Sequence, residues 1–168
     1  MEEIPPRIYE IQAGHILGLN CLQDLVDWAV NAIVVGFDSP SLRVLAGLQA
    51  PFDNQEVDRL FSRVFSELDI ISLTKGNCIP FYIAPIVRQT IEGKIQQRDA
   101  LKKLKDLCLA TNYEKPLMDF YLLYHALSDL EISVNQWYWK GANCENINQI
   151  ISDYFKNWLK NQSADILV

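Results

Sequence analysis

The chain has two histidines, His15 and His125, and His125 stands four residues before Asp129. On a helix this spacing puts both side chains on one face, where Asp129 could orient His125 as a general base. Together with Tyr124, the pair would then line a small-molecule pocket between helices. The simpler interpretation, which we favour, is a half-buried or surface histidine beside a local acid, because structural pairs of this kind are common. We therefore assign no catalytic residue.

The cysteines and histidines do not form a metal-binding pattern. The four cysteines lie far apart, without a Cys-x-x-Cys pair or a histidine at ligand spacing. The two histidines also lack the His-Glu-x-x-His arrangement of a zinc site. We expect no metal, no cofactor and four reduced, mostly buried thiols, namely Cys21, Cys78, Cys108 and Cys144.

Charged side chains gather in two further places. Asp24 and Asp27 are three residues apart, as acids in a metal or acid–base site can be. They also fall near the N-terminus of a predicted helix, where the helix dipole favours negative charge. The one basic cluster runs from Lys94 to Lys105, and no glycines accompany it as a phosphate cradle would require. We interpret both clusters as solvated helix faces.

The most suggestive feature is the triplet Trp137, Tyr138 and Trp139. Three adjacent aromatic residues cannot all point into one core from a short loop, so at least one is expected near the surface. Exposed aromatic anchors dominate binding hot spots and mark contact sites. The alternative, which we favour because tryptophan is usually mostly buried, is that two of the rings cover the helical core while Tyr138 keeps its hydroxyl in water. The triplet is still a candidate partner-binding site.

The elements that position these residues are predicted to be helices, organised around the stretch from Asp38 to Ile70. Asp53 is the expected N-cap of its main helix, with Glu56 at capping-box spacing. The apolar residues that follow recur every three or four positions and therefore share one face. They are Val57, Leu60, Phe61, Val64, Phe65 and Leu68.

The rest of the chain is predicted to be an extended arm over 1–14, further helices and a frayed tail over 162–168. Turn and cap residues divide the helices, among them Gly36, Pro51 and Gly93. Pro85 is expected to kink or restart one helix. The fold class is therefore all-α: a compact single-domain bundle of six to seven helices over 1–168. The expected helices span about 20–35, 39–48, 53–70, 79–92, 97–112, 116–130 and 147–160.

Composition restricts the partners. Of 168 residues, 49% are hydrophobic and 21% charged, which suits a globular core, and the formal net charge is −6. That sign disfavours nucleic acid, because phosphate backbones would be repelled. The N-terminus carries acids where a signal peptide has bases, and no apolar run approaches the roughly 20 residues that span a bilayer. We expect no membrane contact and a cytoplasmic location.

Three segments carry a resemblance: DSPSLRVLAGLQAPFDNQEVDRLFSRVFSEL, DLCLATNY and QWYWKGANCENINQII. Across about two-thirds of its length, the chain resembles a group of small helical proteins from bacterial genomes that has no established activity. The resemblance implies a helical fold and a bacterial cytosolic setting. It transfers no catalytic residue.

The sequence thus favours a non-catalytic cytosolic module that binds another protein, possibly itself, and an acidic immunity- or antitoxin-like role would suit basic partners. Two alternatives stay open. One is a small-molecule binder or enzyme with a pocket near His125, and the other is a structural homodimer subunit.

Overall fold

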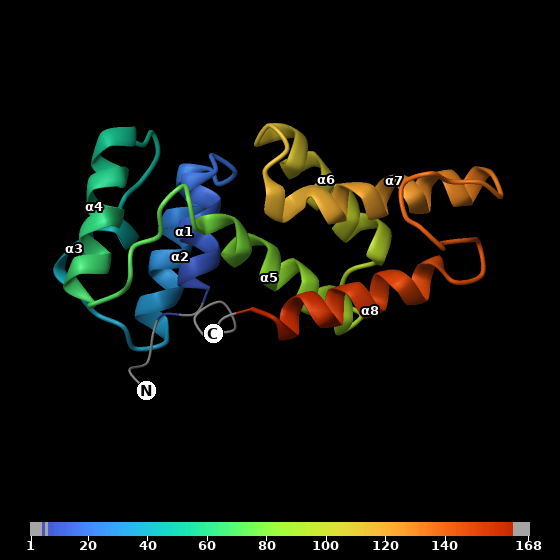
Figure 1. The fold of residues 1–168 in the computed structure, drawn as a ribbon. Coiled ribbons are helices and arrows are strands. Elements are labelled where there is room, and N and C mark those ends of the chain that lie inside the picture. Colours follow the sequence, from blue (N-terminus) through green and yellow to red (C-terminus); the bar gives the residue numbers. More distant parts are fainter. Residues whose placement is uncertain (1–4, 6, 163–168) are drawn as a thin grey trace. The chain divides into compact units, whose positions relative to one another are not determined.

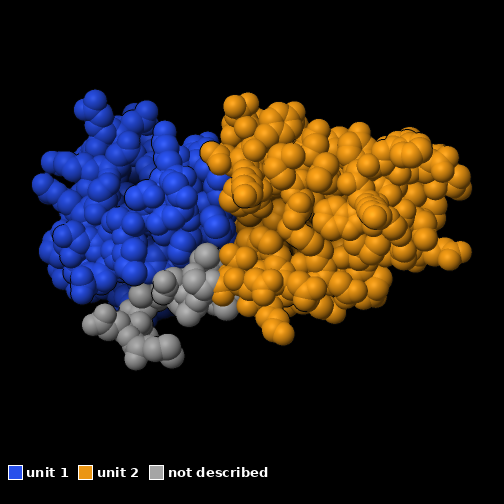
Figure 2. Space-filling model, in the orientation of Figure 1, with its two compact units in different colours: residues 1–82 blue, residues 83–168 orange. Residues whose placement is uncertain are grey.

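The computed structural model describes residue 5 and residues 7–162, and this part of the chain contains helices and no strand (Figure 1). The expected all-α class is confirmed. The residues fall into two compact units, 1–82 and 83–168 (Figure 2). The described elements are α1 (Ile8–Ile16), α2 (Leu22–Val34), α3 (Pro40–Ala46), α4 (Asn54–Glu67), α5 (Cys78–Ile91), α6 (Gln97–Ala110), the 3-10 helix η1 (Lys115–Leu117), α7 (Met118–Ile132) and α8 (Ile147–Lys160).

The core of unit 1 is built on α4, as the sequence predicts. The Asp53 carboxylate accepts the Glu56 N–H at 2.7 Å and caps the helix. The inner face of α4 is buried among residues of α1, α2 and α3. Its buried members are Val57, Leu60, Phe61, Val64 and Phe65.

Hydrogen bonds to two side chains, the Ser39 hydroxyl and the Glu67 carboxylate, hold the N-terminus of the short helix α3. Ser39 caps it by accepting the Leu42 N–H, and Pro40 takes the first helical position. Glu67, from the end of α4, accepts the Ser41 N–H at 2.8 Å and the Ser41 hydroxyl at 2.7 Å. These bonds lower the pKa of the Glu67 carboxyl. They also place a carboxylate at the positive end of α3, which stabilises the helix.

The predicted extended arm is wrong over residues 8–14, which belong to α1. With this helix, the described residues contain eight α-helices instead of the expected six to seven. Ile8 and Ile11 are buried in the unit 1 core. The buried Gln12 side chain accepts the Leu73 N–H at 2.5 Å, and His15 Nε2 lies 3.0 Å from Asp58 Oδ1. These tertiary contacts join the segment to the rest of unit 1, and they depend on residues far from it in the chain. Residues 1–4 and 6 of the arm, and 163–168 of the predicted tail, lie outside the described residues.

Two helix boundaries differ from expectation. Cys21 is the N-cap of α2, one residue after the start of the predicted helix at 20; the Asn20 side chain donates its amide to the Ile11 carbonyl oxygen at 2.8 Å. The helix α5 continues through Pro85 and does not restart there. Gly36 and Gly93 adopt left-handed conformations (φ 102° and 74°) just after their helices, as predicted.

Unit 2 packs α7 against α6 and α8. Phe120 is fully buried, and its ring lies 5.4–5.7 Å from those of Tyr154, Phe155 and Trp158. Tyr121 and Tyr124 on α7 are only half-buried. The buried side is Phe120, Leu123, Ala126, Leu127 and Leu130.

Within the described residues, no helix combines the length and apolar character that crossing a membrane requires.

Candidate functional site

The aromatic triplet lies on the loop of residues 133–146 between α7 and α8, hereafter the Trp137 loop. Its backbone is organised by one side chain, that of Gln136. The Gln136 Oε1 accepts the N–H groups of Tyr138 and Trp139 at 2.9 and 2.8 Å. Its Nε2 donates to the carbonyl oxygens of Trp139 and Ala142 at 2.6 and 3.1 Å. The amide therefore satisfies four backbone groups of a segment that has no secondary structure of its own.

Two asparagines close the far end of the loop. Asn143 Oδ1 accepts the N–H groups of Glu145 and Asn146 at 2.9 and 3.1 Å. Asn146 Oδ1 accepts the Asn143 N–H at 2.7 Å, and its Nδ2 donates to the Gly141 carbonyl oxygen at 3.0 Å. Asn143 thus forms the turn before α8, and Asn146 is the N-cap.

The loop exposes large apolar side chains. Trp137 is 92% exposed, and near it in the chain Ile132 is 88%, Val134 78% and Tyr138 41% exposed. Scattered exposed apolar residues are ordinary on protein surfaces. Four exposed apolar residues within seven positions, including a tryptophan that is almost fully exposed, are unusual.

Trp139 is less exposed than Trp137. It is half-buried, and its ring packs edge-on against Tyr154 at 5.5 Å. The Tyr154 hydroxyl donates to Asp119 Oδ2 at 2.9 Å. Burial, and then this bond, raise the pKa of Tyr154. Of the two tryptophans in the triplet, one therefore anchors the loop and the other is presented to solvent.

Tyr138 joins the loop to the second predicted site. Its ring stacks on His125 with centroids 5.0 Å apart and planes 30° apart. His125 also contacts Tyr121 at 4.5 Å and Tyr124 at 5.4 Å, and Lys105 Nζ lies 5.0 Å from the Tyr124 ring centroid. The structure thus brings His125, Tyr124 and Tyr138 together as one aromatic cluster.

Asp129 does not belong to this cluster as a partner of His125. Its backbone carbonyl accepts the Ser133 N–H at 2.8 Å, and among the described residues no hydrogen bond or ion pair joins its carboxylate to His125. A general base oriented by Asp129 is therefore not assembled in this structure.

Nor do the described residues provide a metal centre, since no three His, Cys, Asp or Glu side chains among them are close enough to share an ion. The four cysteines are free; Cys78 and Cys108 are buried, whereas Cys21 and Cys144 are exposed, contrary to the expected mostly buried set.

Gln136 is the residue that sequence reasoning missed. The available signal was the density of side-chain amides around the triplet, with Asn135, Gln136, Asn143 and Asn146 in one loop. Such side chains form local hydrogen bonds to the backbone and thereby replace secondary structure.

No protein-family model, curated protein or solved structure matches the chain.

Proposed function

We propose that this protein is a non-catalytic cytosolic protein-interaction module and that the Trp137 loop is its contact surface. The observation that carries the proposal is the 92% exposure of Trp137 on a backbone held by the Gln136 amide. An aromatic side chain can remove about 150–250 Å² from water when a partner covers it. Tryptophan is also among the residues most enriched in binding hot spots.

The ordered backbone strengthens this proposal. A loop that must be ordered on binding loses conformational entropy, which subtracts from the affinity. The bonds of Gln136, Asn143 and Asn146 already fix the Trp137 loop in the free chain. Only the exposed side chains then have to be immobilised.

The charges beside the loop indicate the chemistry of the partner. Asp129, Glu131 and Glu145 flank or belong to the loop, against Lys140 as its one basic residue. Arg98 compensates Glu131, which leaves Asp129 and Glu145 against Lys140, and the whole chain carries −6. The partner that fits is a protein with an apolar pocket for Trp137 and a basic rim around it. An immunity- or antitoxin-like role in a bacterial cell would use such a surface.

The test is affinity capture from a lysate of the source cells, with the wild type, Trp137→Ala and the control Val34→Ala. Val34 is also an exposed apolar residue, but it ends α2 in the other unit. We expect one stoichiometric basic partner with the wild type and the control, and its loss with Trp137→Ala. Capture that is equal in all three, or that is absent from the wild type, contradicts the proposal.

Light scattering at increasing concentration separates the remaining alternatives. A dimer that dissociates in Trp137→Ala would make the occupant a second copy of the chain and overturn the choice of a basic partner. A small molecule that binds the wild type and is lost in His125→Ala would instead favour a pocket at the His125 cluster.

A further inference from the structure

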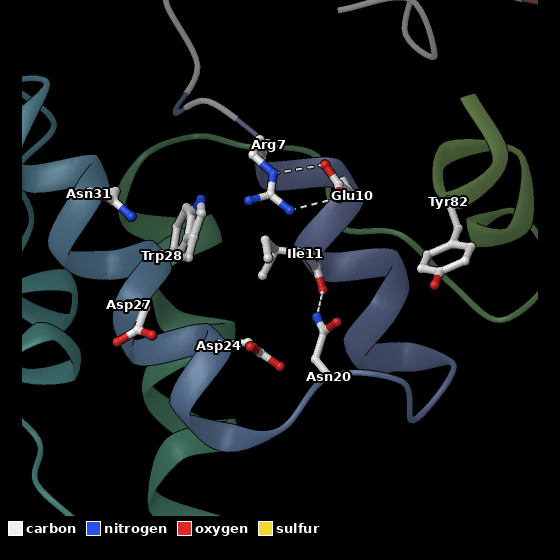
Figure 3. A pocket seen from close by; sticks show the side chains of 9 residues that line it. All are labelled: Arg7, Glu10, Ile11, Asn20, Asp24, Asp27, Trp28, Asn31 and Tyr82. Atoms are coloured by element: carbon white, nitrogen blue, oxygen red, sulfur yellow. Dashed lines mark hydrogen bonds and ion pairs between the residues drawn. The ribbon is translucent and has the colours of Figure 1, made fainter. Parts of the chain in front are cut away.

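An open cavity of about 460 Å³ lies in unit 1, between α1 and α2 (Figure 3). Its volume falls within the range of about 300–1,000 Å³ that is usual for small-molecule sites. The residues that matter to its chemistry are Glu10 and Ile11 from α1, Asp24, Asp27 and Trp28 from α2, and Tyr82. None of its lining residues belongs to the Trp137 loop, and nothing in the proposed function uses it.

The charge in the cavity is unbalanced. Arg7 binds Glu10 through two hydrogen bonds, of 2.9 and 2.8 Å, so these two charges compensate each other. Asp24 accepts the Cys21 N–H at 2.7 Å, and Asp27 accepts the Gln23 amide at 2.7 Å. Both donors are neutral, and the described residues offer neither aspartate an ion pair. Two negative charges thus remain on one wall.

The titration of the neighbouring groups supports a negative field in the cavity. The hydrogen bond to Glu10, and then the charges of Glu10 and Asp24, raise the pKa of the Arg7 guanidinium. Burial, and then the charge of Glu10, raise the pKa of the Tyr82 phenol. Only the charge contributions of Glu10 and Asp24 report on the field, and they have the sign of a negative one; burial raises the pKa of a phenol in any field.

The other surfaces of the cavity are apolar. Ile11 and Trp28 belong to the core cluster, and each offers an edge to the cavity. A ligand for this site therefore needs positive charge for Asp24 and Asp27 and an apolar body for the rest.

A single metal ion does not meet this requirement, since no three acids among the described residues converge on one point. We propose that the cavity binds a short aliphatic polyamine. Its ammonium groups can pair separately with Asp24 and Asp27, which stand three residues apart on α2, while the methylene groups between them lie against Ile11 and Trp28. Charge-assisted hydrogen bonds to Asp24 and Asp27 supply most of the affinity.

The test is calorimetric titration of spermidine into the full chain at low ionic strength, with Asp27→Asn and the control Asp153→Asn. Asp153 accepts the Gln149 amide at 2.8 Å, just as Asp27 accepts the Gln23 amide, so both variants remove one charge from the same local arrangement. We expect saturable 1:1 binding to the wild type and to Asp153→Asn. Asp27→Asn should bind about tenfold or more weakly, the effect of losing one charged hydrogen bond.

A second comparison separates the site from the general attraction of a polycation to an acidic protein. Cadaverine should bind, whereas 1,5-pentanediol, its uncharged analogue of the same length, should not. Absence of saturable binding to the wild type overturns the proposal, as does an equal loss in Asp27→Asn and Asp153→Asn. Binding of an arylalkylamine in preference to spermidine would overturn the aliphatic class.

Discussion

The side-chain amide of Gln136 contacts the backbone of Trp139 at both of its polar groups: Oε1 accepts the Trp139 N–H at 2.8 Å, and Nε2 donates to the Trp139 carbonyl oxygen at 2.6 Å. Trp139 in turn packs on Tyr154. The amide holds the backbone of the loop, and the Trp139 indole packs the loop against α8, while Trp137 remains in solvent. The proposed function accounts for this combination of an ordered loop backbone and an exposed apolar ring.

Gln136→Ala should loosen the loop without unfolding the domain. It removes four hydrogen bonds, but water can replace much of what they contribute. We expect a loss of about 1–2 kcal/mol in the free energy of unfolding, less than the sum of four separate bonds. Hydrogen exchange should become faster at the Tyr138 and Trp139 amides. Unchanged exchange at these amides would show that the loop does not depend on Gln136.

Trp137→Ala should leave the stability of the free protein within about 0.5 kcal/mol of the wild type, because a nearly bare side chain loses almost no packing. Phe120→Ala is the contrasting variant. Its ring is fully buried among three aromatic neighbours, so we expect a loss of about 3–5 kcal/mol. Urea unfolding followed by circular dichroism measures both. A large loss for Trp137→Ala would mean that the ring is part of the core.

Gly14→Ala should destabilise α1 by about 1–3 kcal/mol through overpacking, although alanine is normally the better helix former. A Cβ at Gly14 would lie 2.5 Å from Asn20 Oδ1, and Asn20 is held by its bond to Ile11. Gly47→Ala is the control, since its nearest such contact is 3.5 Å, and it should be close to neutral. Thermal unfolding of the two variants and of Gly14→Ala/Asn20→Ala would reveal the coupling as non-additivity.

The bonds from Ser41 to Glu67 should make stability depend on pH in acid. Because the pKa of Glu67 is lowered in the folded state, the carboxylate stabilises the protein above its unfolded pKa of about 4.3. This contribution is lost as the pH falls through the lower, folded value. The urea midpoint of the wild type should therefore exceed that of Glu67→Gln by the largest amount at pH 7, and this difference should become smaller below pH 4. A difference that is constant with pH would contradict this role.

How far the sequence predicts this structure depends on whether the deciding interactions are local. The helix α4 is predicted with its cap and its buried face because Asp53, Val57 and Leu60 act within a few residues of one another. The helix α1 is not, because the bonds of Gln12 to Leu73 and of His15 to Asp58 join residues far apart in the chain.

The same distinction applies to the candidate site. Three adjacent aromatics are enough to predict that one is exposed, but not that it is Trp137. Trp137 is the exposed ring because Trp139 packs on Tyr154 and Tyr138 stacks on His125, and both of these contacts join the loop to other helices. The His125–Asp129 spacing permits a contact on one helix face, yet the tyrosines around His125 occupy its surface instead.

The most direct measurement is photo-crosslinking in the source cells, with benzoylphenylalanine placed at position 137 and, as the control, at position 34. Both positions carry exposed apolar residues, so the label should not disturb the fold at either. The proposed function predicts one dominant adduct with a basic protein from position 137 and none of that species from position 34. No adduct at position 137, or the same adducts from both positions, would contradict it.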